Sequence, residues 1–78
     1  MLVTVNISLK NGVLDPQGKT IQKALHSLNF DKVTDVKMAK QIKLEINEKD
    51  KTKALELVKN MCEELLVNTV IEDYEILL

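Results

Sequence analysis

Apolar and polar residues alternate at the start of the chain. The apolar set is rich in β-branched side chains and consists of Val3, Val5, Ile7 and Leu9, with Thr4, Asn6, Ser8 and Lys10 between them. A period of two is typical of a strand with one buried face. Further along, Ile21, Ala24, Leu25 and Leu28 recur at helical spacing. This spacing predicts a helix over 16–28.

The turn between these two elements carries a helix-start signal. Asp15 can accept from free backbone amides as an N-cap, and Pro16 suits the first helical position because the amide it lacks would have no partner there. Gly12 allows a positive φ in the turn. Gly18 has two open explanations. It is either a tolerated weak point in the first turn of the helix or a position where another backbone approaches closely.

After the first helix, the pattern returns to strands. Asn29 suits the left-handed position that ends a helix, with Phe30 folding back on the last turn. Alternation then predicts a strand over 33–39 and another over 42–46. Only Ala39 and Lys40 are available for a bend, so we expect a tight hairpin between these strands.

The second half of the chain predicts a longer helix and a last strand. Asn47 is the expected cap, with Glu48 and Asp50 in the first turn. The expected buried stripe of this helix consists of Ala54, Leu55, Val58, Met61, Cys62 and Leu65. A last strand over 71–78 places Tyr74, Ile76 and Leu78 on one face.

The element order β-α-β-β-α-β predicts a single α+β domain over residues 1–78. Right-handed crossovers of two split β-α-β units give the ferredoxin-like plait. In that fold the four-stranded antiparallel sheet has the order 4-1-3-2, and both helices lie on one face. The other face is expected to be open. The fold hosts many unrelated activities, so function must be argued from particular residues.

Composition excludes several classes of function. The chain has 78 residues, a net charge of −1 and one cysteine, and its 11 basic residues are all lysine. This balance and the absence of arginine argue against nucleic-acid binding. We find neither a signal-peptide pattern nor an apolar run long enough to cross a membrane, so we expect a soluble, cytoplasmic protein. A domain this small without disulfides often gains stability by associating, which favours a homodimer or larger homo-oligomer.

No residue pattern indicates catalysis, cofactor binding or a metal site. His26 is the only histidine and lacks an orienting partner and a nucleophile nearby in sequence, so it is more simply a surface or interface residue. Cys62 falls in the predicted apolar stripe and is expected to be buried and inert. The acidic group Glu72, Asp73 and Glu75 is more simply a solvated strand edge than a cation site. No phosphate-binding loop, C-x-x-C motif or catalytic triad is present.

Two activities known for the plait fold are also excluded for this chain. An acylphosphatase-like site needs an arginine, and a metal carrier of this fold needs paired cysteines in the first loop. A binding or scaffolding module remains. The leucines Leu57, Leu66 and Leu77, with Val67, fall off the predicted core stripes and are candidates for contact with partners.

Three stretches of the sequence are also familiar. Residues 9–18 (LKNGVLDPQG), 24–28 (ALHSL) and 67–75 (VNTVIEDYE) resemble the PurS family, and the resemblance runs over essentially the whole chain. Members usually have glycine where this chain has Asn29 and Ala39, and often proline where it has Thr69. These three departures concern the geometry of turns.

The resemblance implies a non-catalytic subunit of phosphoribosylformylglycinamidine synthase in purine biosynthesis. Such a subunit oligomerises, bridges a glutaminase subunit and a large synthetase subunit, and supports ammonia transfer between them. ATP and magnesium are then used by the synthetase, and no cofactor is expected on this chain. The added interface candidates are Asp15, Pro16, Gln17, Gly18 and His26. The alternative is a regulatory plait domain that senses a small molecule.

Overall fold

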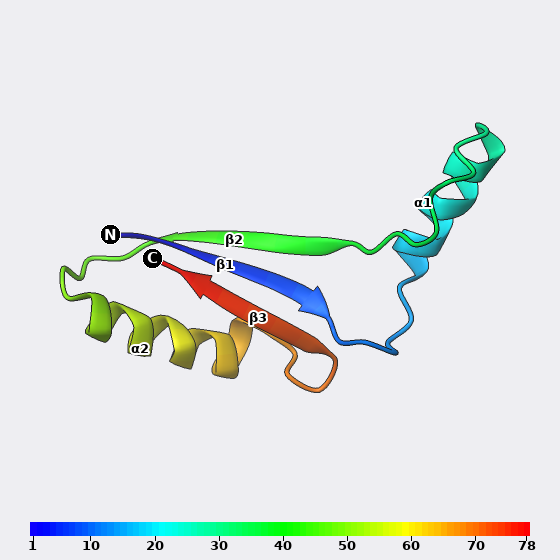
Figure 1. Ribbon diagram of the computed structural model, residues 1–78. Coiled ribbons are helices and arrows are strands. Elements are labelled where there is room, and N and C mark those ends of the chain that lie inside the picture. The colour runs from blue at the N-terminus through cyan, green and yellow to red at the C-terminus, as the bar shows by residue number, and fades with distance from the viewer.

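The computed structural model describes residues 1–78 as a three-stranded antiparallel sheet with two helices (Figure 1). The elements in chain order are β1 (Leu2–Leu9), α1 (Pro16–Ser27), β2 (Ala39–Glu45), α2 (Lys51–Met61), a π-helical segment (Cys62–Leu66) and β3 (Glu72–Leu77). The strand order is β2-β1-β3. The fold is therefore a small α+β arrangement with β1 in the centre.

The core forms where β1 meets α2. Val3, Val5 and Ile7 of β1 are buried, as the alternating pattern predicts. They pack with Val58 and Cys62 from α2 and the residue that follows it. The neighbouring strands add Ile42 and Ile76, which both pair with Val5 in the sheet. Cys62 is buried, as the sequence predicts.

The start of α2 differs from the prediction. The N-cap is Asp50, whose Oδ1 accepts from the backbone amides of Thr52 at 2.8 Å and Lys53 at 3.2 Å. Asn47 lies outside the helix, because Glu48 Oε1 accepts from the amides of Lys49 and Asp50, both at 3.1 Å, and closes a turn before the helix begins.

The end of α2 shifts the predicted apolar stripe. In the π-helical segment the amide of Val67 donates to the Cys62 carbonyl, five residues back, so the residues here are displaced around the helix axis. Leu65 is consequently 83% exposed, and Leu66 is half-buried against the core. Val67 is buried. The assignments of Leu65 to the core and of Val67 to the surface are therefore wrong, as is that of Leu55, which is exposed.

The predicted strand over 33–39 and its tight hairpin do not form. Ala39 and Lys40 pair with Ser8 and Ile7, so they belong to β2 instead of a bend. Residues 33–38 connect α1 to β2 without strand pairing and are held along α1 instead, by hydrogen bonds from His26 and Gln22 and by the bond from the Met38 amide to Asp15. The three strands that form keep their predicted relative order, and the fourth position, beside β2, is empty in this chain.

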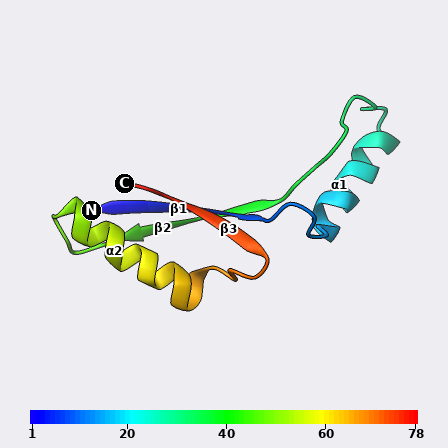
Figure 2. The ribbon, with the colours of Figure 1, turned by 60° about the horizontal axis from the view of Figure 1, so that its bottom comes forward.

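The position of α1 is the largest departure from the predicted plait. Helix α2 lies along the sheet, whereas α1 lies beyond the end of the strands (Figures 1 and 2). The radius of gyration is 16.2 Å, against about 11.5 Å for a compact domain of this length. Ile21 and Leu28 of the predicted α1 stripe are exposed. The two helices therefore do not share one face of the sheet, because the turn before α1 and the segment after it hold the helix at the sheet's end.

Candidate functional site

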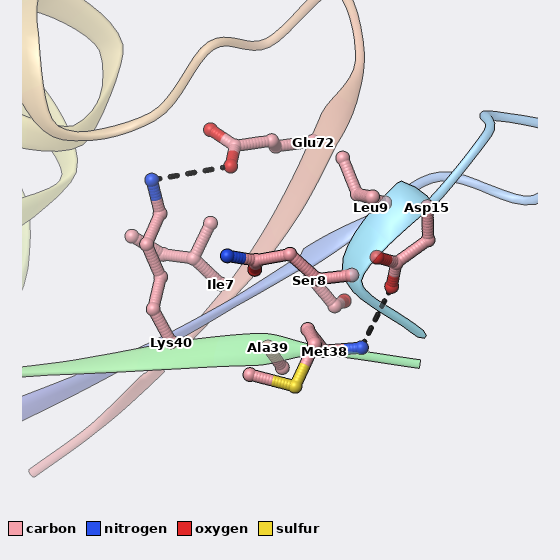
Figure 3. A pocket seen from close by; sticks show the side chains of 9 residues that line it. Ile7, Ser8, Leu9, Asp15, Met38, Ala39, Lys40 and Glu72 are labelled. Atoms are coloured by element: carbon pink, nitrogen blue, oxygen red, sulfur yellow. Dashed lines mark hydrogen bonds and ion pairs between the residues drawn. The ribbon is translucent and has the colours of Figure 1, made fainter. Parts of the chain in front are cut away.

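A hollow of about 310 Å³ lies where the sheet meets α1 (Figure 3). Strand residues on its wall include Ile7, Leu9 and Lys40, and Glu72 faces Lys40 across it. Asp15 and Gln17, from the start of α1, form another wall with Met38. The hollow thus joins the sequence motif around Asp15 to all three strands.

Asp15 uses both carboxylate oxygens within the chain. Its Oδ1 accepts from the Gly18 amide at 2.9 Å, which confirms the predicted N-cap. Its Oδ2 accepts from the Met38 amide at 2.7 Å, a contact between distant residues that the sequence does not predict. These amides, Gly18 first, lower the pKa of Asp15 because they stabilise its charged form. Pro16 occupies the first helical position as predicted.

Glu72 makes a similar double contact on the opposite wall. Its Oε1 accepts from the Asn68 amide at 2.8 Å, and its Oε2 lies 3.3 Å from the Lys40 Nζ. The Asn68 amide, followed by Lys40, lowers the pKa of Glu72. The Glu72 side chain is only 12% exposed, so the expected solvated edge is wrong for this residue. The sequence does not predict the ion pair between Lys40 and Glu72, because it places Lys40 in a bend.

Gly18 is buried, and its explanation is now clear. A Cβ built on Gly18 would overlap the backbone carbonyl oxygen of Val36 and lie 3.0 Å from the Asp15 carboxyl group. Close approach of a backbone is therefore the correct explanation of the two, and that backbone belongs to the same chain. Gly18 lets residues 33–38 pass directly against the first turn of α1.

His26 lies near the other end of α1 and is exposed. Its Nε2 donates to the Val33 carbonyl oxygen at 2.7 Å. One turn earlier, Gln22 Nε2 donates to the Thr34 carbonyl oxygen at 3.2 Å. The His26 ring thus holds the segment that follows α1 against the helix. The end of the helix is also as predicted, because Asn29 has φ 72° and the Phe30 amide donates to the Leu25 carbonyl.

The interface candidates from the sequence do not form one surface. Asp15, Pro16, Gln17 and Gly18 make the first turn of α1. Leu57, Leu66 and Leu77 belong instead to the unit of α2, the π-helical segment and β3. Of these three, Leu57 and Leu77 are exposed, while Leu66 packs against the core. Their part in an interface stays a prediction.

The hollow is suited to holding segments together. Both of its carboxylates are paired with amides or lysine of the same chain. Cys62 lies elsewhere, and burial raises the pKa of its thiol. No cluster of three or more His, Cys, Asp or Glu side chains has the arrangement of a metal site. The helices are also too short or too polar to cross a membrane.

The sequence matches known proteins over nearly its whole length. The family model described as PurS, phosphoribosylformylglycinamidine (FGAM) synthase, matches residues 2–78. The PurS subunit of this synthase from Bacillus subtilis is 53% identical over 72 residues, which is 92% of this chain and 84% of the relative. The corresponding subunit from Methanocaldococcus jannaschii is 48% identical over 73 residues, covering 94% of this chain and 88% of the relative.

Solved structures agree with the sequence comparison. The crystal structure of Methanocaldococcus jannaschii PurS superposes with a TM-score of 0.87 at 47% identity, covering 97% of this chain and 92% of that one. The structure of PurLQS from Thermotoga maritima contains a chain with a TM-score of 0.83 at 39% identity, covering 99% of this chain and 96% of that one. The chain therefore belongs to the PurS family, a subunit family of phosphoribosylformylglycinamidine synthase.

Proposed function

We propose that the chain is an accessory, non-catalytic subunit that bridges the glutaminase and synthetase subunits of phosphoribosylformylglycinamidine synthase in the cytoplasm and supports ammonia transfer between them. The main support for this proposal is the position of α1, which extends past the sheet with apolar residues exposed. An isolated chain in this form exposes apolar side chains that a partner could cover. The similarity to a chain of the Thermotoga maritima PurLQS structure supports partners of this kind.

A second copy of the chain is the first partner we propose. Only 9 of 78 residues are buried, so a single copy has a very small core. Ile42 and Leu44 of β2 are only half-buried, while Ile21 of α1 and Leu28 at its C-cap are exposed. If α1 of each copy lies against β2 of the other, both apolar surfaces are covered by one symmetric contact.

This exchange would also complete the predicted plait. Each sheet would then carry two helices on one face, one from each copy. The empty position beside β2 would be open to a fourth strand from the second copy, giving the predicted order with residues from both chains. The fourth strand and the order 4-1-3-2 are thus proposed for the assembly.

ATP and magnesium are, in this proposal, used by the synthetase subunit alone. The charged groups that line the hollow support this division, because Asp15 and Glu72 are each paired inside the chain. The regulatory alternative, a domain that senses a small molecule, gains no support from the relatives named above, which are all PurS subunits.

Reconstitution of the synthase tests the proposal. The glutaminase and synthetase subunits are assayed with and without this chain, using either glutamine or ammonium chloride as the nitrogen source. We expect the chain to be needed for glutamine-dependent synthesis and to have little effect with ammonium chloride. Equal glutamine-dependent rates without the chain would refute the bridging role. Turnover of glutamine or ATP by the purified chain alone would refute the non-catalytic role.

A further inference from the structure

We propose that Asp15 is the positioning residue that sets the direction of α1 relative to the sheet. One carboxylate joins two backbone amides from different parts of the chain. Oδ1 holds the Gly18 amide inside the first turn of α1, and Oδ2 holds the Met38 amide directly before β2. Figure 3 shows Asp15 reaching across to Met38 at the edge of the hollow. The inference rests on the proposed function, in which α1 must meet its partners in a defined direction.

The other side-chain hydrogen bonds of α1 do not reach the sheet. His26 and Gln22 bind α1 to residues 33 and 34, and Gly18 packs against Val36. These contacts join the helix to the segment that follows it. Only residues close to β1 or β2 can fix the resulting unit to the sheet, and Met38 is adjacent to the first paired residue of β2.

A second link near the same place is weaker. Lys37 Nζ donates to Asn11 Oδ1 at 3.4 Å, and both side chains are exposed. An exposed, flexible lysine at this distance restrains the backbone poorly. The Asp15 bond to the Met38 amide is shorter and joins directly to the main chain.

Helix capping alone would not require a carboxylate with two acceptors. Asp50 provides the comparison, because its Oδ1 accepts from Thr52 and Lys53, both at the start of its own helix. Serine or asparagine caps a helix about as well as aspartate. Serine has only one side-chain oxygen, and asparagine replaces one acceptor with a donor. At position 15 either substitution leaves one acceptor oxygen, which in the capping geometry faces the Gly18 amide and not the Met38 amide.

The matched pair Asp15→Asn and Asp50→Asn tests the inference. Spin labels on Lys23→Cys in α1 and Lys43→Cys in β2 report the distance between helix and sheet, while buried Cys62 stays unlabelled. Labelled chain is diluted into unlabelled chain so that only distances within one copy contribute. Circular dichroism checks that each variant keeps its helices, and Asp15→Ser serves as a second variant that keeps the cap.

We expect Asp15→Asn and Asp15→Ser to broaden or shift the distance distribution, and Asp50→Asn to leave it unchanged. Hydrogen exchange at the Met38 amide should rise about two- to tenfold in the Asp15 variants, with Gly18 less affected. An unchanged, narrow distribution in both Asp15 variants would overturn the inference, as would an equal change in Asp50→Asn.

A measurement on the unsubstituted chain complements the variants. The amide resonances of Gly18 and Met38 should move together as pH falls, with one midpoint below the usual range of an aspartate. Lys10, Lys37, Lys40 and Glu72 are the other charged side chains around this carboxylate, but the Gly18 and Met38 amides both donate to Asp15. Separate midpoints for the two amides would contradict a shared carboxylate.

The distance measurement needs no synthase partner, so its outcome is independent of the proposed function. The Asp15→Asn chain is then added to the reconstituted synthase. A changed α1 direction with a reduced glutamine-dependent rate supports both ideas. A changed direction with an unchanged rate keeps the role of Asp15 and counts against the need for a fixed α1 in the assembly.

Discussion

Replacing Gly18 with alanine tests the packing at the base of α1. The added methyl group would overlap the Val36 carbonyl oxygen and press on the Asp15 carboxyl group at 3.0 Å. Because the obstacle is backbone, it cannot yield by changing a rotamer. Residues 33–38 would have to move away from the helix, together with the Met38 amide that Asp15 binds.

Two opposing effects set the size of the change. Overpacking of a close contact typically destabilises by about 1–3 kcal/mol. Alanine is the better helix former by about 1 kcal/mol. The net result is a loss of up to about 2 kcal/mol, and we expect a value near the upper end because the contact is with main-chain atoms. In a domain of this size each kcal/mol lowers the Tm by about 4–8 °C.

Thermal unfolding at one fixed protein concentration measures this loss, since association would make the Tm depend on concentration. Lys19→Ala is the control, because Lys19 is the next residue in α1 and is exposed. We expect Lys19→Ala to melt close to the parent chain and Gly18→Ala to melt well below it. A Gly18→Ala chain that melts at or above the parent temperature would refute the close approach of Val36.

Two further predictions concern acid and association. The hydrogen bond from the Asn68 amide, followed by the nearby Lys40, lowers the folded-state pKa of Glu72. The stabilisation from Glu72 is therefore present above its unfolded pKa of about 4.3 and is lost as pH falls through the folded-state pKa. Glu72→Gln should flatten the fall in Tm between neutral pH and pH 2.5, and an unaltered acid profile would contradict the pairing. Leu28, the C-cap residue of α1, is 66% exposed, and changing it to serine should weaken self-association of the chain about ten- to a hundredfold. Leu14→Ser, at a similarly exposed site in the loop before α1, should have little effect in sedimentation. Equal effects of the two substitutions would argue against α1 and its C-terminal end as the contact.

Features set by neighbouring residues could be predicted from the sequence. The alternation around Val5, the cap at Asp15, the proline at 16 and the left-handed residue Asn29 all depend on local backbone chemistry. Each is present in the structure. Local patterns also placed α1 correctly along the chain, since the helix runs over Pro16–Ser27.

Features set by distant residues could not be predicted in the same way. Whether Ala39 bends or extends depends on its pairing with Ser8, which lies 31 residues earlier. The direction of α1 depends on the Met38 amide and the Val36 carbonyl, and neither is distinguished by its side chain. The apolar pattern of α1 predicts that one face of the helix is buried, but it does not show whether the residues that bury it come from the same copy of the chain.

The hollow could not be predicted from the sequence for the same reason. Its paired groups, Lys40 with Glu72 and Asp15 with Met38, come from segments that meet only in the folded chain. The end of α2 adds a different difficulty. The π-helical segment changes the periodicity after Cys62, so a regular helical stripe places Leu65 on the wrong side.

One copy of this chain leaves α1 uncovered, and we expect it to associate with further copies for this reason. Sedimentation equilibrium on the purified chain at micromolar concentration tests this claim most directly. We predict a mass that is a multiple of the 8.9 kDa chain, twice or more, falling on dilution as copies separate. A single species of 8.9 kDa across the whole concentration range would contradict the claim.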